Sequence, residues 1–445
     1  MQRKLMCQLE SWKASDERRP LLVIGARQVG KTWLMKEFGR TSFSRTAYLR
    51  FDNDAALCAL FEADYNLTRI LAGIEILVGF KISPENTLIV FDEIQECPRA
   101  LTALKYFCEE RRDLFIVAAG SFLGLAEHEG TGFPVGKVDR LTLRPMSFHE
   151  FLLAVGESRL AEAVDKKDFA LCRPFSARLA DLLKTYLFVG GMPEVVAGYV
   201  AHGDFRRVRA RQNALLKDFR DDFSKHAPKE TVPRINLVWD SLPVQLAKEN
   251  KKFVYSHVKA GLRSKDLEDA LQWLVSAGLI SKVARVTCPM RPLISYEDGA
   301  FKLFSLDVGL LCAQAKVNAR LLLEGDRLFR EFKGALAEQY VQQELRAVEG
   351  EVFEPHYWAN ESSTAEVDFI VETECGVWPI EVKAEKNLRA KSVKTFCERF
   401  HLAEAVRTSL ADEKDSVCPI EGEVLRIMDV PLWAIAKIGE ICQMA

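Results

Sequence analysis

The stretch that decides the fold is Leu21-Leu-Val-Ile-Gly25-Ala-Arg-Gln-Val-Gly30-Lys31-Thr32, an apolar run that leads into a glycine-rich turn. Gly25 and Gly30 let the backbone curl, so that successive N–H groups point inward toward phosphate oxygens. A helical pattern follows over residues 33–38, and the positive end of that helix faces the same place. The stretch predicts a strand, a phosphate-binding loop and a helix, and therefore a bound ATP or GTP.

Single residues of this loop have separate roles toward a nucleotide. Lys31 supplies a cation to the β- and γ-phosphates, and Thr32 supplies a hydroxyl to Mg²⁺. A chance match to the GxxxxGK[ST] pattern is the alternative, but the strand before the loop and the helix after it disfavour chance. The predicted nucleotide-binding residues here are Gly25, Ala26, Arg27, Gln28, Val29, Gly30, Lys31, Thr32 and Trp33.

Two further apolar runs end in polar side chains. The run 87–91 is followed by Asp92 and Glu93. Continuous apolar runs indicate buried parallel strands, and ligands of open α/β sheets bind at the carboxyl ends of such strands. We predict that Asp92 holds the Mg²⁺ shell and that Glu93 orients the attacking water. The run 114–121 places Ser121 at the same edge, where it either senses the γ-phosphate or simply ends a strand.

Composition bounds the remaining possibilities. The 445 residues are 48% hydrophobic and 28% charged, and the formal net charge of −2 excludes a basic coat over the whole surface. Any nucleic acid would therefore have to bind a local basic patch, such as the arginines of residues 206–211. We interpret that segment instead as the solvated face of a helix. The 11 cysteines include no CxxC pair, which indicates reduced thiols and no zinc site. Apolar runs are strand-sized, far below the ~20 residues that a bilayer requires, so we expect a cytoplasmic protein without a membrane partner.

A second chemical pattern lies near the C-terminus. Residues 366–372 and 378–384 alternate as strands around a turn at Gly376. Glu381 and Lys383, two residues apart, share one face. In a hairpin with a two-residue turn, Asp368 lies opposite Glu381 or, one register on, opposite Lys383. Facing carboxylates are destabilising unless a positive charge lies between them, and a divalent metal ion is the natural candidate.

The segment 332–341 reads as a helix that could add Glu338 to the same site. Predicted metal ligands are therefore Glu338, Asp368 and Glu381, besides Thr32 and Asp92. This pattern is typical of metal-dependent phosphodiester cleavage, in which carboxylates hold Mg²⁺ and the lysine helps to position or activate water. By spacing alone, a solvated hairpin face that carries acids and a lysine is the more common explanation.

Motifs in a fixed order resemble the prokaryotic AAA-type ATPases that carry a C-terminal DUF4143 region, over nearly the whole chain. They are Gly25-Ala-Arg-Gln-Val-Gly-Lys-Thr32, Phe91-Asp-Glu-Ile-Gln95, Ala119-Gly-Ser121, Arg144-Pro-Met-Ser-Phe-His-Glu-Phe151, Gly190-Gly-Met-Pro193, Phe301-Lys-Leu-Phe-Ser-Leu-Asp-Val-Gly-Leu310, Glu366-Val-Asp-Phe369 and Ile380-Glu-Val-Lys383. The resemblance implies a P-loop ATPase domain and a C-terminal domain similar to PD-(D/E)XK nucleases. The Gly-Gly-x-Pro element is also similar to the adenine-side motif of archaeal-type and STAND ATPases, which makes Pro193 a candidate nucleotide contact.

The chain departs from the family pattern at two places. Many relatives carry Gly-Arg where this chain has Gly136-Lys137, with Arg140 and Arg144 as nearby substitutes for a trans-acting arginine. Ser121 stands where AAA+ proteins more often use asparagine. Because of these two departures, the sequence does not determine the rate of ATP hydrolysis or the coupling between subunits of an oligomer. The nuclease-like residues show no departure.

The predicted architecture is an α/β chain of four domains. Alternating strands and helices to about residue 155 indicate a P-loop parallel sheet. The mostly helical lid or linker follows, and then two helices and a hairpin that read as a winged helix, which either binds DNA or only packs. The predicted ranges are 1–155 for the P-loop domain, 156–249 for the helical region, 250–315 for the winged-helix-like domain and 316–445 for the restriction-endonuclease-like α/β domain.

These observations favour an ATP-hydrolysing switch or motor that uses ATP and Mg²⁺ and is coupled to a DNA-directed nuclease-like module. The predicted catalytic residues are Lys31 and Glu93 for ATP, and Asp368, Glu381 and Lys383 for the C-terminal site. The alternative is a signalling ATPase whose C-terminal domain is a non-catalytic binding or assembly module for a protein partner. A homo-oligomer is compatible with either hypothesis.

Overall fold

The computed structural model describes most of the chain as two compact units. One unit comprises residues 2–144 with 276–278, and the other comprises 145–275 with 279–445. The described residues are 2–121, 134–247, 252–319, 330–347, 354–360, 365–384, 390–410, 414–420 and 423–444.

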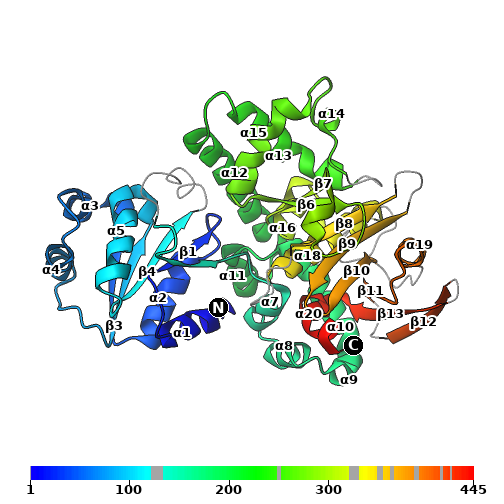
Figure 1. Cartoon of the computed structure of the whole chain (residues 1–445), viewed down its shortest axis with the longest axis horizontal. Coiled ribbons are helices and arrows are strands. Elements are labelled where there is room, and N and C mark those ends of the chain that lie inside the picture. The colour runs from blue at the N-terminus through cyan, green and yellow to red at the C-terminus, as the bar shows by residue number, and fades with distance from the viewer. Residues whose placement is uncertain are drawn as a thin grey trace. The chain divides into compact units, whose positions relative to one another are not determined.

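The N-terminal unit is built on a parallel sheet of five described strands in the order β2-β3-β4-β1-β5 (Figure 1). Every neighbouring pair in it is parallel, which confirms the predicted α/β sheet. β3 and β4 are buried along their whole length, as their continuous apolar runs predict. The strands are β1 (Leu21–Gly25), β2 (Arg45–Arg50), β3 (Thr87–Asp92), β4 (Phe115–Ser121) and β5 (Asp139–Thr142).

Helices cover both faces of this sheet. On one face, apolar side chains of α3, α4 and α5 pack against Ile89, Phe91 and Ile116 in one continuous core. On the other face, Trp12 of α1 packs against both Phe38 of α2 and Phe115 of β4. The helices are α1 (Leu5–Ala14), α2 (Lys31–Ser42), α3 (Ala55–Glu62), α4 (Leu67–Val78) and α5 (Pro98–Glu110).

The second unit begins with helices. These are α7 (Phe148–Ala154), α8 (Ser158–Asp165), α9 (Phe169–Cys172), α10 (Ser176–Val189), α11 (Pro193–His202), α12 (Phe205–His226), α13 (Val232–Leu246), α14 (Tyr255–Val258) and α15 (Ser264–Ser276). Four more described helices follow, α16 (Val308–Gln314), α18 (Arg330–Arg346), α19 (Lys391–Phe400) and α20 (Ile438–Met444). The mostly helical character predicted for this region is confirmed over the described residues 158–246.

A mixed sheet of eight described strands forms the rest of this unit, in the order β12-β13-β11-β10-β9-β8-β6-β7. The strands are β6 (Ile280–Val286), β7 (Glu297–Ser305), β8 (His356–Ala359), β9 (Glu366–Thr373), β10 (Gly376–Val382), β11 (Glu404–Ser409), β12 (Lys414–Ile420) and β13 (Glu423–Pro431). A bridge between Arg285 and Tyr357 joins the β6–β7 hairpin to β8. The order of helix, helix and hairpin predicted within residues 250–315 is present as α14, α15 and the β6–β7 pair, but this hairpin continues the sheet that holds β9 and β10.

A buried polar junction explains the Gly190-Gly191 pair. The N–H of Gly191 donates to Asp307 (2.6 Å), and its carbonyl accepts from the N–H of Met146 (2.7 Å). Gly190 has a φ of 77°, in the left-handed region. A Cβ added to Gly191 would lie 2.1 Å from the carbonyl oxygen of Met146. Burial raises the pKa of Asp307 to about 6, although these backbone donors favour its charged form.

This close approach predicts different outcomes for two glycine substitutions a few residues apart. Gly191→Ala should destabilise the protein by about 2 kcal/mol or more, because the methyl group meets backbone that cannot move away. Gly198→Ala, within α11, meets nothing within 4 Å and should be neutral or stabilising by up to ~1 kcal/mol. Chemical denaturation of both variants measures the difference, and equal stabilities would contradict this packing.

Candidate functional site

The phosphate loop lies between the end of β1 at Gly25 and the start of α2 at Lys31. Gln28 and Gly30 have φ values of 64° and 98°, so they provide the left-handed turns of the loop. Gly25 is needed for a different reason than the one we predicted. A Cβ there would lie 2.4 Å from the carbonyl oxygen of Leu143, in the segment that follows β5. Gly25 therefore permits close packing of two backbones, and the curl comes from the later residues.

Lys31 lies across its own loop. Its Nζ donates to the carbonyl oxygens of Gly25 and Ala26, at 3.0 Å each. Burial lowers the pKa of Lys31 to about 8, and the nearby charges of Glu93 and Asp92 oppose this effect only in part. A phosphate group that enters the loop would offer this cation a stronger partner than two carbonyl groups.

The two predicted magnesium ligands of the N-terminal unit are in contact. The Thr32 hydroxyl donates to Oδ2 of Asp92 (2.7 Å), and Asp92 is buried at the end of β3. The hydroxyl of Tyr48 in β2 donates to the same oxygen (2.6 Å), and the N–H of Glu93 donates to Oδ1 (3.1 Å). Burial and the bond to Asp92 raise the pKa of Tyr48 above its usual range. Hydroxyl and carboxylate oxygens in this arrangement suit a hard divalent cation.

Glu93 is held in an unusual backbone conformation next to this pair. Its φ of 54° is uncommon outside glycine, and such residues concentrate at functional sites. The side-chain amide of Gln95 donates to Oε2 of Glu93 (2.6 Å). Gln95 thus fixes the direction of the carboxylate that we predict to orient water.

Sequence reasoning missed three residues that shape this site. Tyr48 carries no motif signal, since only the pairing of β2 with β3 brings it to Asp92. Gln95 lies two residues after Glu93 in the same quoted motif, which is a signal that could have been used. Arg3 is buried and donates to the carbonyl oxygens of Val29 (2.9 Å) and Arg144 (2.6 Å), so it ties the loop to the end of the unit.

The other predicted nucleotide-site residues are placed as follows. Ser121 ends β4 directly opposite Gly25 and is buried. Trp33 exposes 41% of its surface on the first turn of α2. Pro193 is the first residue of α11, a position that suits proline whatever its partners, and its contact with nucleotide stays a prediction. Lys137 forms an ion pair with Glu109 (2.8 Å).

In the second unit, the predicted hairpin is confirmed. β9 and β10 are antiparallel, and residues 374 and 375 form the turn between the paired residues Thr373 and Gly376. The last paired residues are Phe369 and Ile380. Extending this register by one residue sets Asp368 opposite Glu381, which is the first of the two predicted registers. The ladder stops there, because Oδ2 of Asp368 accepts from the N–H of Val382 (2.8 Å).

Three carboxylates converge beside this hairpin. Oxygens of Glu338 in α18 and of Glu366 and Asp368 in β9 all lie within 4.8 Å of one another. Glu338 and Asp368 were predicted to share a site, and the structure brings them together. Glu366 was missed, although its position two residues before Asp368 places both side chains on one face of the strand.

Glu381 and Lys383 form an ion pair at the edge of this group. The second oxygen of Glu381, Oε2, is buried and has no hydrogen-bond partner among the described residues. Burial raises the pKa of Glu381, the Lys383 ammonium opposes that effect, and the nearby charges of Glu338 and Glu366 add to it. Glu381 is thus a buried carboxylate with one oxygen still available to a cation or a water.

A lysine from outside the hairpin completes the site. Lys302 of β7 is fully buried and forms an ion pair with Glu366. Its Nζ lies 3.5 Å from Oε2 of Glu338 and 4.7 Å from the ring centre of Tyr357. Burial alone would lower the pKa of Lys302, but the surrounding carboxylates outweigh it and raise the pKa above the usual range. Its sequence signals are its place in the quoted motif that begins at Phe301 and its charge between the apolar residues Phe301 and Leu303.

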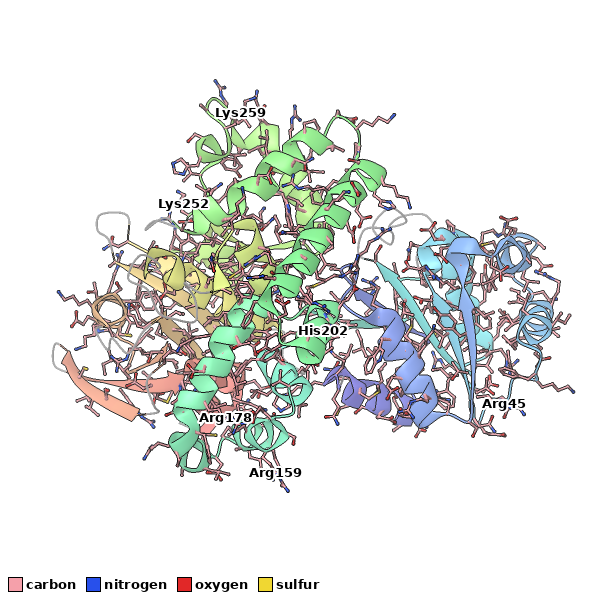
Figure 2. All side chains as sticks on the ribbon, turned by 180° about the vertical axis from the view of Figure 1, so that it is seen from behind. Arg45, Arg159, Arg178, His202, Lys252 and Lys259 are labelled. Atoms are coloured by element: carbon pink, nitrogen blue, oxygen red, sulfur yellow. The ribbon has the colours of Figure 1, made fainter. Side chains whose placement is uncertain are left out.

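The basic segment 206–211 exposes Arg206 and Arg207, whereas its other two arginines contact neighbouring groups. In α12, Arg209 donates to the carbonyl oxygen of Val317 (2.7 Å) and stacks on Phe188, while Arg211 pairs with Glu194. Further exposed basic side chains of this unit come from several separate segments, and Figure 2 labels Arg159, Arg178, His202, Lys252 and Lys259 among them.

Comparisons with known proteins agree with the site geometry. An AAA domain model matches residues 17–152, a domain of unknown function, DUF8612, matches 180–321, and another, DUF4143, matches 333–433. The chain therefore contains an AAA-type P-loop ATPase domain followed by a DUF4143 region. In the part of the chain that the structure describes, no helix combines the length and apolar character needed to cross a membrane.

Similar solved structures come from several organisms. The Walker-type ATPase of Pyrococcus abyssi is 14% identical, with 69% of this chain and 94% of that chain covered and a TM-score of 0.43. Cdc6p of Pyrobaculum aerophilum is 11% identical (72% and 93% covered, TM-score 0.25), and PCH-2 of C. elegans is 17% identical (36% and 44% covered, TM-score 0.21). A comparison with curated proteins found no match.

The lowered pKa of Lys31 predicts a proton effect on ATP binding. In the nucleotide-free protein at pH 8.5 this lysine is mostly neutral, whereas phosphate oxygens favour its charged form and raise its pKa. ATP binding at pH 8.5 should therefore take up roughly half a proton or more, and much less at pH 7. Calorimetry in buffers of different ionisation enthalpy measures this uptake. Lys31→Arg, which stays charged, is the control, and equal uptake by both proteins would contradict the assignment.

Proposed function

We propose that the N-terminal unit hydrolyses ATP with Mg²⁺. The observation that carries this proposal is the 2.7 Å contact between Thr32 and Asp92, beside a left-handed glycine turn at the N-terminus of α2. The loop N–H groups and Lys31 would bind the phosphates. When bound, Mg²⁺ would neutralise charge between the β- and γ-phosphates.

Within this proposal each side chain has a defined task. Thr32 and Asp92 would hold the ion, and Tyr48 would fix the orientation of Asp92 through its hydroxyl. Glu93 would accept a hydrogen bond from the attacking water, with its carboxylate aimed by Gln95. Ser121, at the end of the neighbouring strand β4, would contact the γ-phosphate side of the same edge.

Two substitutions separate binding from hydrolysis. Lys31→Ala should reduce ATP turnover by roughly 10²-fold or more, because it removes the cation at the β- and γ-phosphates. Glu93→Gln should retain ATP binding and slow turnover to a similar degree, because the amide no longer draws the proton of the attacking water. Steady-state phosphate release and nucleotide-binding calorimetry measure both. Turnover within a few-fold of wild type in Lys31→Ala would refute the phosphate-loop assignment.

We infer, second, that the C-terminal site binds a divalent ion for phosphodiester cleavage of DNA. The support is the convergence of Glu338 and Asp368 with Glu366, next to the Glu381–Lys383 pair. The carboxylates would hold the ion, and Lys383 would position water or stabilise developing charge.

The exposed side of α15 carries Lys265, Glu268 and Asp269, a mixture of charges that favours packing over DNA binding for that helix.

The chain also offers a route from the ATPase unit to this site. Met146 and Phe148 directly follow the N-terminal unit, and both are anchored in the second unit. The carbonyl of Met146 accepts from the Tyr186 hydroxyl (2.5 Å), and the N–H of Phe148 donates to Glu344 in α18 (2.9 Å). Glu344 lies six residues after Glu338, about 9 Å along the same helix. Movement of the segment after the ATPase unit would therefore be passed to a metal ligand.

The C-terminal proposal is tested with one aspartate. Asp368→Ala should remove Mn²⁺- or Mg²⁺-dependent DNA cleavage and leave ATP turnover intact, because its carboxylate belongs to the second unit alone. Glu398→Ala, at an exposed position of α19, is the matched control and should cleave as wild type does. If wild-type protein cleaves no form of DNA with either ion, the C-terminal region is the non-catalytic binding or assembly module of the alternative hypothesis.

A further inference from the structure

We propose that Arg3 is a positioning residue of the phosphate loop. It holds the peptide that joins Val29 to Gly30 so that the N–H of Gly30 points toward the bound phosphates. This role rests on the nucleotide site proposed above for the N-terminal unit, and it belongs to a residue outside the GxxxxGK[ST] pattern. Arg3 acts through the backbone of the loop and needs no contact with the nucleotide itself.

The contacts of Arg3 are the first support. Its guanidinium donates through Nη1 to the carbonyl oxygen of Val29 (2.9 Å) and through Nη2 to that of Arg144 (2.6 Å). Only 7% of the surface of Arg3 is exposed, so water does not readily replace either contact. The planar fork of an arginine suits two separate acceptors, and a charged donor makes a stronger hydrogen bond than a neutral one. One side chain thus fixes the loop to the segment that follows β5.

The geometry of the peptide bond is the second support. The carbonyl of Val29 and the N–H of Gly30 belong to one trans peptide unit, in which the two groups point in opposite directions. Arg3 draws the carbonyl to one side, and the N–H is therefore directed to the other side. In a loop that binds phosphate through its backbone, such an N–H group is one of the donors.

Gly30 makes the orientation of this peptide depend on an outside contact. Glycine adopts positive and negative φ about equally well, so the residue type alone does not impose the φ of 98°. The side chain of Val29 is fully buried. Reversing the peptide plane, however, changes only the ψ of Val29 and the φ of Gly30, and it leaves that side chain in place. The hydrogen bond from Arg3 supplies a preference for one of the two orientations.

Both ends of the Arg3 bridge are anchored to the parallel sheet. Arg3 begins the turn that leads into α1, since its carbonyl oxygen accepts from the N–H of Met6 (3.1 Å), and α1 packs on β4. The second acceptor, Arg144, directly follows Leu143, whose N–H donates to the carbonyl oxygen of Ile24 in β1 (2.7 Å). The guanidinium therefore holds the loop against a fixed frame.

The test compares Arg3→Gln with Arg19→Gln in the full chain. Arg19 donates to the carbonyl oxygen of Gly136 (2.9 Å) in the same unit, but it precedes β1 and so lies at the opposite end of that strand from the loop. Calorimetric titration with Mg²⁺ and ADP measures affinity without hydrolysis. Arg3→Gln should weaken ADP binding by roughly tenfold or more, because one phosphate donor is no longer held in place. Arg19→Gln should bind ADP as wild type does.

Two further measurements separate positioning from stability. Arg3→Lys keeps the charge but replaces the fork with a single nitrogen on a shorter side chain, so its ADP affinity should fall between those of Arg3→Gln and wild type. An N–H held by Arg3 contacts phosphate in the ground state and in the transition state alike. Arg3→Gln should therefore raise the KM for ATP more than it lowers kcat. Calorimetric melting shows which variants are folded.

The outcomes distinguish the role of Arg3 from the proposed ATPase. Weaker ADP binding by folded Arg3→Gln, in a protein whose wild type does not turn over ATP, supports the role of Arg3 and refutes the ATPase. Wild-type affinity in folded Arg3→Gln overturns the role of Arg3 and leaves the ATPase intact, as does an equal loss in Arg19→Gln. If Arg3→Gln does not fold, Arg3→Lys takes its place, and wild-type affinity in Arg3→Lys overturns the role. Wild-type protein that binds no ADP refutes both.

Discussion

Buried carboxylates that must be matched by donors or cations are the constraint on which both units depend. At the end of β3, Asp92 accepts from Thr32, Tyr48 and the N–H of Glu93. In the second unit, Glu366 and Glu338 are matched by Lys302. In each case the side-chain partners come from distant parts of the sequence, so the fold as a whole is what makes the charge tolerable. Sites that hold negative charge ready in this way are suited to a divalent ion beside phosphate.

The helix α18 connects this electrostatic arrangement with the rest of the second unit. Its side chains reach in several directions, since Glu338 joins the acidic group, Gln343 donates to Tyr186 (2.8 Å), and Glu344 accepts from Phe148. Gln343 also accepts from the N–H of Val308 (2.9 Å), next to the aspartate that holds the Gly190-Gly191 turn. Motifs that are far apart in the chain thus converge on one helix. Such convergence gives the segment after the ATPase unit a physical path to the acidic group.

The sequence allowed much of this to be predicted where local rules apply. Continuous apolar runs gave the buried strands β3 and β4, and alternation gave the β9–β10 hairpin. The register of that hairpin, which sets Asp368 opposite Glu381, was one of the alternatives that the sequence left open. Local sequence rules do not predict which strands from distant parts of the chain pair with each other. Nothing in the residues around Tyr48 or Lys302 tells that β2 pairs with β3, or that β7 lies in one sheet with β9. The need for a glycine at position 25 also comes from a distant segment, the backbone of Leu143. The local pattern therefore led us to assign a different role to Gly25.

The central claim is that both units gather carboxylates in order to hold a divalent ion. The most direct measurement is a crystal structure with Mn²⁺ and a non-hydrolysable ATP analogue, with anomalous scattering used to locate manganese. We expect one peak between Thr32 and Asp92 beside the phosphates, and one peak among Glu338, Glu366 and Asp368, each ~2.0–2.6 Å from ligand oxygens. Nucleotide bound without manganese near Asp92, together with an acidic group that holds no ion, would contradict it.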